Sequence, residues 1–80
     1  MTTTSHTRQE SVRQALGRAL GRAPEELADD IELASLVAES FALVETVISI
    51  QEELGIRLLQ EDLRNVGTVG ELIAACVRHL

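Results

Sequence analysis

The pattern of apolar and polar residues divides the chain into three helical stretches joined by two connections. In the first helical stretch the apolar residues recur with the period of a helix, and they are Val12, Ala15, Leu16, Ala19 and Leu20. Thr7 and Glu10 precede them at capping-box spacing, and Gly21 follows as a suitable helix end. We therefore predict a helix over residues 8–20, with residues 1–7 as a disordered tail.

The second helical stretch, residues 40–54, carries two apolar stripes. Leu43, Val47, Ile50 and Leu54 form the stripe expected to face the core. The second stripe is formed by Phe41, Val44 and Ile48. Because a helix in so small a domain buries only one broad face, we expect the second stripe to be an exposed patch that binds partners. A bundle that surrounds this helix on more sides than usual is the alternative.

The rest of the chain supplies one more helix and two connections. Residues 22–39 show no sustained period, which predicts a long connection with a short helical turn near residues 25–28. Residues 56–60 are predicted to be extended and residues 61–65 to form a short helix. Thr68 and Glu71 repeat the capping box and open a last helix over residues 69–78. The expected fold is all-α, a small helical bundle of three main helices and one short helix, in a single domain of residues 1–80.

Composition agrees with this architecture. Hydrophobic residues make up 45% of the 80 residues, yet Phe41 is the single aromatic residue, which favours packed helices over sheet. The single Cys76 cannot form an internal disulfide, and its place on an apolar helix face indicates a core residue. The N-terminal segment is polar and no run of 18 apolar residues occurs, so we expect a soluble, cytoplasmic protein without a membrane span.

The net charge of −6 is unevenly distributed. Residues 25–62 contain eleven acidic residues and one basic residue, Arg57, whereas most of the other arginines lie toward the two ends of the chain. An acidic middle repels the phosphates of nucleic acids and attracts basic protein surfaces. Nucleic acid is therefore an unfavourable ligand, although acidic residues also serve solubility alone.

Ser40 stands at the predicted start of the second helix, where free backbone N–H groups and the helix dipole favour a phosphate. A serine in this position is most often a simple N-cap. Nearly the whole chain, however, resembles the acyl carrier protein family. The resemblance is most specific over residues 30–54, which are similar to the signature of that family. The matching positions of the signature, including its modified serine at Ser40, are Leu33, Leu36, Ser40, Val44 and Glu45. The resemblance implies that Ser40 carries a covalent 4′-phosphopantetheine derived from coenzyme A.

Three residues depart from the signature. Val37 stands where the family usually has Gly, Glu39 where it has Asp, and Phe41 where it has Leu. Glu39 and Phe41 keep the charge and the apolar character of the family residues. Val37 would be strained if the family Gly requires a positive φ, and the backbone before Ser40 would then differ from that of the family.

The resemblance implies a stand-alone acyl carrier protein that is not itself an enzyme. A phosphopantetheinyl transferase would use coenzyme A and Mg²⁺ to modify Ser40, and the arm would hold acyl groups as thioesters. Acyl-loading enzymes, ketosynthases and other biosynthetic enzymes with basic docking patches are the expected partners of a monomer. We assign docking to an acidic set that steers association and an apolar set that fixes register. This docking surface comprises Glu39, Glu45, Glu52, Phe41, Val44 and Ile48.

The departures from the signature, and a chain that contains Arg but no Lys, favour a bacterial polyketide or related antibiotic pathway. The alternatives are a carrier for fatty-acid synthesis and an unmodified, carrier-like interaction module. A hydrolase with Ser40 as nucleophile would need a base, and the two histidines, His6 and His79, lie in the terminal segments. Together with Cys76 they lack the spacing of a zinc site, so neither a catalytic nor a metal site is expected.

Overall fold

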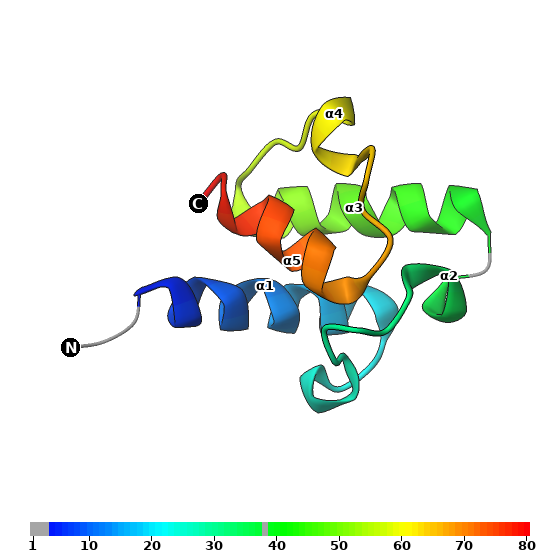
Figure 1. Cartoon of the computed structure of the whole chain (residues 1–80), viewed down its shortest axis with the longest axis horizontal. Helices are drawn as coiled ribbons and strands as arrows, with labels where there is room; N and C mark the ends of the chain where they lie inside the picture. The colour runs from blue at the N-terminus through cyan, green and yellow to red at the C-terminus, as the bar shows by residue number, and fades with distance from the viewer. Residues whose placement is uncertain (1–3, 38) are drawn as a thin grey trace.

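The computed structural model describes residues 4–37 and 39–80, and in this part of the chain it contains five α-helices, one 3₁₀ helix and no extended strand. The elements in chain order are α1 (Thr4–Leu20), η1 (Pro24–Glu26), α2 (Leu33–Leu36), α3 (Ser40–Leu54), α4 (Gln60–Leu63) and α5 (Val69–Val77). Helices α1 and α3 run in opposite directions along the molecule, and α5 packs across them (Figure 1). The expected all-α helical bundle is confirmed.

The core lies where α1, α3 and α5 meet. Its fully buried side chains include Leu16 of α1, Ile50 of α3 and Leu72 of α5. Within the apolar stripe predicted to face the core, Val47 and Ile50 are buried, and Leu43 and Leu54 pack against them while partly exposed. Cys76 is also buried, as its position on an apolar helix face indicated.

Helix α1 begins at Thr4, four residues before the predicted start at Arg8. Residues 4–7, which were expected in a disordered tail, form its first turn, and the other residues of that tail lie outside the described part. The hydroxyl of Ser11 donates to the carbonyl of Thr7 at 3.1 Å, so Thr7 is an interior residue of the helix and not its cap. A capping box favours a helix start but does not prevent extension, because neither Gly nor Pro precedes it.

The first connection is more structured than the sequence indicated. The turn predicted near residues 25–28 is the 3₁₀ helix η1, and the four-residue helix α2 follows it. This connection is fastened to the start of α5 by three backbone hydrogen bonds. The N–H groups of Gly70 and Val69 donate to the carbonyls of Asp29 and Ile31, and the N–H of Leu33 donates to Gly67, each at 2.9 Å.

The remaining helix ends agree with the predictions to within one or two residues. Gly21 and Gly55 adopt positive φ values of 70° and 67° directly after α1 and α3, a conformation that glycine adopts at no steric cost. At the start of α5, Thr68 accepts from the N–H of Glu71 at 3.2 Å, and the Glu71 carboxylate accepts from the N–H of Thr68 at 3.0 Å. The second capping box is therefore confirmed.

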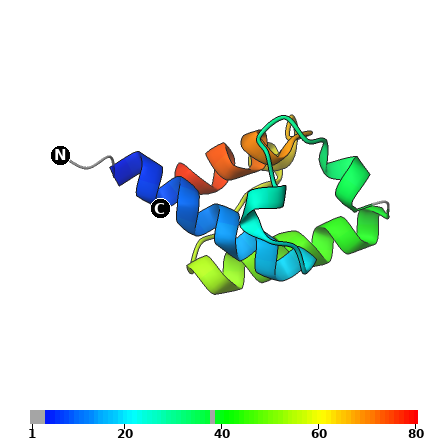
Figure 2. The ribbon, with the colours of Figure 1, turned by 90° about the horizontal axis from the view of Figure 1, so that it is seen from below.

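The two ends of the molecule along its long axis are formed by different elements. The first turns of α1 and the C-terminal end of the chain lie at one end, whereas α2 and the start of α3 lie at the other (Figures 1 and 2). None of the helices described is both long and apolar enough to cross a bilayer. The start of α3 thus lies far from the first turns of α1 and from the C-terminal end of the chain along the long axis (Figure 1).

Candidate functional site

Ser40 is the first residue of α3, as the sequence predicted. The preceding Glu39 is in the extended conformation, with φ −102° and ψ 136°, and its side chain makes no capping hydrogen bond. The first turn of α3 contains no acidic residue. The N–H groups at this end of a 15-residue helix therefore have no competing carboxylate, and they suit a phosphate on the adjacent serine.

The residue that departs most from the carrier signature, Val37, fits its place. Val37 directly follows α2 with φ −132° and ψ 101°, which is ordinary extended backbone, and its N–H donates to the carbonyl of Leu33 at 2.9 Å. A β-branched residue is favoured in this conformation. The strain considered for Val37 is absent; Ala38 lies outside the described residues.

The second apolar stripe of α3 is exposed, as predicted. Phe41 is 71% exposed, Val44 52% and Ile48 47%, which is unusual for three large apolar side chains on one helix. Their spacing of three and four residues places them on one face. The exposed patch is confirmed, and the alternative of a helix surrounded on all sides is wrong.

The acidic residues assigned to docking, Glu39, Glu45 and Glu52, are all exposed. Glu39 and Glu45 line an open depression between α3 and the end of α1, together with Ala42. Val44 and Ile48 instead line a hollow on the other flank of α3. The predicted docking surface therefore has Glu39 and Glu45 on one flank of α3 and Val44 and Ile48 on the other.

That hollow is an apolar cavity of about 420 Å³ between α3 and α4. Its wall on the α3 side includes Leu43 and Val47, and its opposite wall includes Leu58 and Leu63. The two polar residues of the lining are Gln51 and Gln60. Val44 and Ile48 are shared by the cavity and the exposed patch, so a partner that covers the patch also covers one margin of the cavity.

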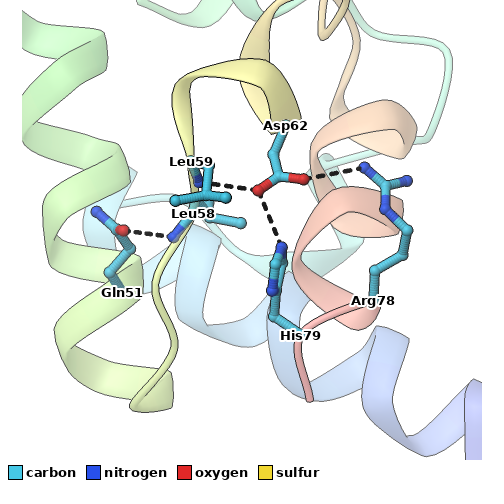
Figure 3. A network of polar contacts seen from close by, with 6 residues as sticks. All are labelled: Gln51, Leu58, Leu59, Asp62, Arg78 and His79. Atoms are coloured by element: carbon cyan, nitrogen blue, oxygen red, sulfur yellow. Dashed lines mark hydrogen bonds and ion pairs between the residues drawn. The ribbon is translucent and has the colours of Figure 1, made fainter.

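The sequence did not reveal a polar network that joins α4 to the C-terminal residues (Figure 3). The Asp62 carboxylate accepts from the N–H of Leu59 at 2.8 Å, lies 3.0 Å from Nε2 of His79 and 3.7 Å from the Arg78 guanidinium. The hydrogen bond from Leu59 is the main cause that lowers the pKa of Asp62, and His79 and Arg78 add to it. An acidic residue at the third position of a helix, as Asp62 is in α4, was a signal for the first contact only.

No cluster of three or more metal-binding side chains occurs among the described residues. His79, one of the two histidines, contacts Asp62 near the C-terminus and lies at the opposite end of the molecule from the start of α3 (Figures 1 and 3). His79 is therefore not placed to act on Ser40.

An all-α bundle whose central helix begins with a serine agrees with the architecture of a carrier domain. Residues 10–76 match the family model described as a phosphopantetheine attachment site. This match spans most of the 80 residues, so the chain belongs to that family. It carries acyl groups on a covalent 4′-phosphopantetheine, and carrier domains of this kind interact with phosphopantetheinyl transferases and biosynthetic enzymes.

Proposed function

We propose that this carrier is modified on Ser40 and serves, as a stand-alone monomer in the cytoplasm, a bacterial polyketide or related natural-product pathway. The observation that carries the proposal is the position of Ser40 as first residue of α3, beside an exposed apolar patch and without a side-chain cap from Glu39. The bound group supplies a terminal thiol that holds an acyl group as a thioester.

The backbone at the start of α3 has one task in this proposal. Its N–H groups and the positive end of the helix dipole stabilise the negative charge of the phosphodiester on Ser40. An interaction of this kind contributes about 0.3 to 1 kcal/mol at an exposed helix end. Transfer of the acyl group from the thioester is left to the partner enzymes.

The docking surface has two further tasks. Glu39, Glu45 and Glu52 attract basic partner surfaces over a distance and accelerate encounter without requiring tight binding. Phe41, with 71% of its surface exposed, is the main apolar anchor. Burial of an aromatic side chain of this kind contributes about 1.5 to 3 kcal/mol, a magnitude compatible with brief association and ready release.

The departures of Val37, Glu39 and Phe41 from the signature, and a chain with Arg but no Lys, support the natural-product pathway. The cavity between α3 and α4 supports the second candidate, a carrier for fatty-acid synthesis, because its lining is almost entirely apolar. A saturated chain loses no hydrogen bonds on entering such a lining, whereas a polyketide loses those of its carbonyl groups.

The attachment residue is tested by intact mass after co-expression with a phosphopantetheinyl transferase. We expect a mass increase equal to one phosphopantetheine, which is lost in Ser40→Ala and retained in the matched control Ser49→Ala on the same helix. An unmodified interaction module would show no increase with any transferase. An increase that persists in Ser40→Ala would place the modification elsewhere.

Docking is tested by stopped-flow association with the modifying transferase at several salt concentrations. Glu45→Lys should slow association and flatten its salt dependence, whereas Glu25→Lys, at an exposed site away from α3, should have little effect. Phe41→Ala should accelerate dissociation without changing the thermal midpoint. Association that does not respond to salt or to Glu45→Lys would refute electrostatic docking.

A further inference from the structure

A second hollow lies beside the start of α3, on the flank opposite the apolar cavity. It is the open depression between α3 and the end of α1, and its volume is about 720 Å³. Residues from both sides of Ser40 in the sequence line it, with Val37 and Glu39 before the serine and Ala42 after it. Helices α1 and α3 lie side by side at this place (Figures 1 and 2). The depression is therefore adjacent to the residue that the proposed function modifies.

The lining of this depression changes in character along α3. Close to the start of the helix it is apolar and includes the half-buried Val37 and Ala42. Further along the helix it is polar and includes Thr46 and Ser49. Ser49 lies nine residues after Ser40 in the same helix, which corresponds to about 14 Å along its axis. A ligand attached at the serine would match this lining if its apolar group came first and its polar groups followed.

The polar part of the lining can both accept and donate hydrogen bonds. Thr46 is 7% exposed and its hydroxyl donates to the carbonyl of Ala42 at 2.9 Å, so its oxygen can still accept. Ser49 is exposed, and its hydroxyl can donate or accept. The exposed carboxylates of Glu39 and Glu45 accept only. The lining therefore suits a neutral chain with amide and hydroxyl groups.

We propose that this depression holds the 4′-phosphopantetheine arm while no partner enzyme is bound. Beyond its phosphate the arm is uncharged, and it carries in order a geminal dimethyl group, a hydroxyl, two amides and a thiol. Val37 and Ala42 contact the dimethyl group, and Thr46 and Ser49 bind the amides. The phosphate stays at the N–H groups that begin α3, so it does not enter the space between the two carboxylates. This inference rests on the proposed modification of Ser40.

The apolar cavity on the other flank of α3 is a poorer place for the arm. Its two polar residues are Gln51 and Gln60, and the Gln51 carbonyl oxygen already accepts from the N–H of Leu58 at 2.6 Å. Amide groups that enter an apolar lining lose the hydrogen bonds that they make with water. The depression lets them keep hydrogen bonds, since hydroxyl and carboxylate oxygens are available there.

The inferred site also links docking to release of the arm. Glu39 and Glu45 belong both to this depression and to the proposed docking surface. A basic partner surface that binds these carboxylates covers the depression and displaces the arm. The thiol thus becomes free to move at the moment when a partner enzyme is present.

The experiment uses the full chain with isotope labels in the protein but not in the arm, which a transferase adds from coenzyme A. In the loaded protein we expect nuclear Overhauser effects between the dimethyl group and the methyl groups of Val37 and Ala42. Amide chemical shifts of Thr46 and Ser49 should also differ between the unmodified and the loaded chain. Overhauser effects to the methyl groups of the apolar cavity would overturn the inference. So would shift changes confined to the immediate neighbours of Ser40, which indicate a free arm.

Matched variants test the lining itself. Ser49→Ala should lower the ratio of bound to free arm by about two- to tenfold, the range of one hydrogen bond, and so weaken the Overhauser effects. Ser11→Ala removes an exposed hydroxyl from α1 and should leave them unchanged. Ala42→Leu fills the depression and should abolish contacts with Val37, whereas Ala74→Leu adds the same atoms at an exposed site of α5 and should not.

Intact mass separates failure of this inference from failure of the proposed function. A wild-type chain that gains no mass would refute the modification, and the inference with it. A chain that carries one arm but shows none of the expected contacts would refute the inference alone. Equal Overhauser effects in Ser49→Ala and Ser11→Ala, or effects to Val37 that persist in Ala42→Leu, would also refute it.

Discussion

Gly70 lies in the first turn of α5, where the first connection crosses the helix. Its N–H donates to the carbonyl of Asp29 at 2.9 Å. A Cβ added at this position would lie 2.9 Å from Cβ of Asp29 and 3.1 Å from the same carbonyl oxygen. Because carbon atoms pack best at about 3.5 to 4 Å, Gly70→Ala must push the two segments apart.

The net effect is a balance of three terms. Overpacking of this degree costs about 1 to 3 kcal/mol. The hydrogen bond to Asp29 loses up to about 1 kcal/mol as the segments separate. Against these, alanine is favoured over glycine in a helix by up to about 1 kcal/mol. The last two terms are similar in size and opposite in sign, so the variant should lose about 1 to 3 kcal/mol, which lowers the thermal midpoint of a domain of this size by about 4 to 24 °C.

Thermal unfolding followed by circular dichroism measures this change. Gly67→Ala is the matched control, since its added Cβ would meet only a Glu71 carboxylate oxygen at 3.5 Å, an ordinary contact. It should unfold within about 3 °C of the wild type, as substitutions without a steric conflict do. If Gly70→Ala unfolds at the same temperature as Gly67→Ala or above it, the close approach to Asp29 does not limit stability and the reasoning is refuted.

Three further variants or measurements test other parts of the fold. Hydrogen bonds from the backbone N–H groups of Gly67 and Thr68 lower the pKa of Glu71 below its ordinary 4.5. This stabilisation is complete above pH 4.5 and is lost as the pH falls through the lower folded-state pKa, so wild type and Glu71→Gln should converge in acid. A constant difference between their urea midpoints at every pH would contradict this. Burial raises the pKa of Cys76 to about 11, so a disulfide reagent at pH 8 should label the native chain much more slowly than the urea-unfolded chain; equal rates would mean an accessible thiol. Ile50→Ala empties a fully buried site and should cost about 2 to 5 kcal/mol in urea unfolding, and a cost under about 1 kcal/mol would place Ile50 outside the core.

The main helices were predictable because several local signals agree in each. In α3, a core stripe and the terminal Gly55 mark the same helix, and in α5 the period begins directly after the Thr68 capping box. The start of α1 was misplaced because a capping box is a preference and not a barrier. Helix α2 was missed because four residues show no period, and its place is set by the hydrogen bond from Leu33 to the distant Gly67.

The candidate site also contains features that could be predicted from the sequence and features that could not. The exposure of Phe41 was predicted from the sequence. A helix in so small a domain buries only one broad face, and in α3 the core stripe already occupies that face. The extended backbone at Val37 could not be predicted, because the sequence alone does not show which φ value this position requires. The contact between Asp62 and His79 joins residues 17 positions apart on different parts of the chain, and only the packing of α4 beside the C-terminus brings them together.

The separation of the chain ends from the start of α3 has a practical consequence for how this carrier is handled. A linker attached before α1 would tether the protein to a sensor chip or to a fused enzyme at the end away from the start of α3 (Figure 1). A purification tag after Leu80 would instead adjoin Arg78 and His79, and it would alter the surroundings of Asp62. Immobilisation through the N-terminal side is therefore the orientation that leaves the proposed docking surface and the contacts of Asp62 undisturbed.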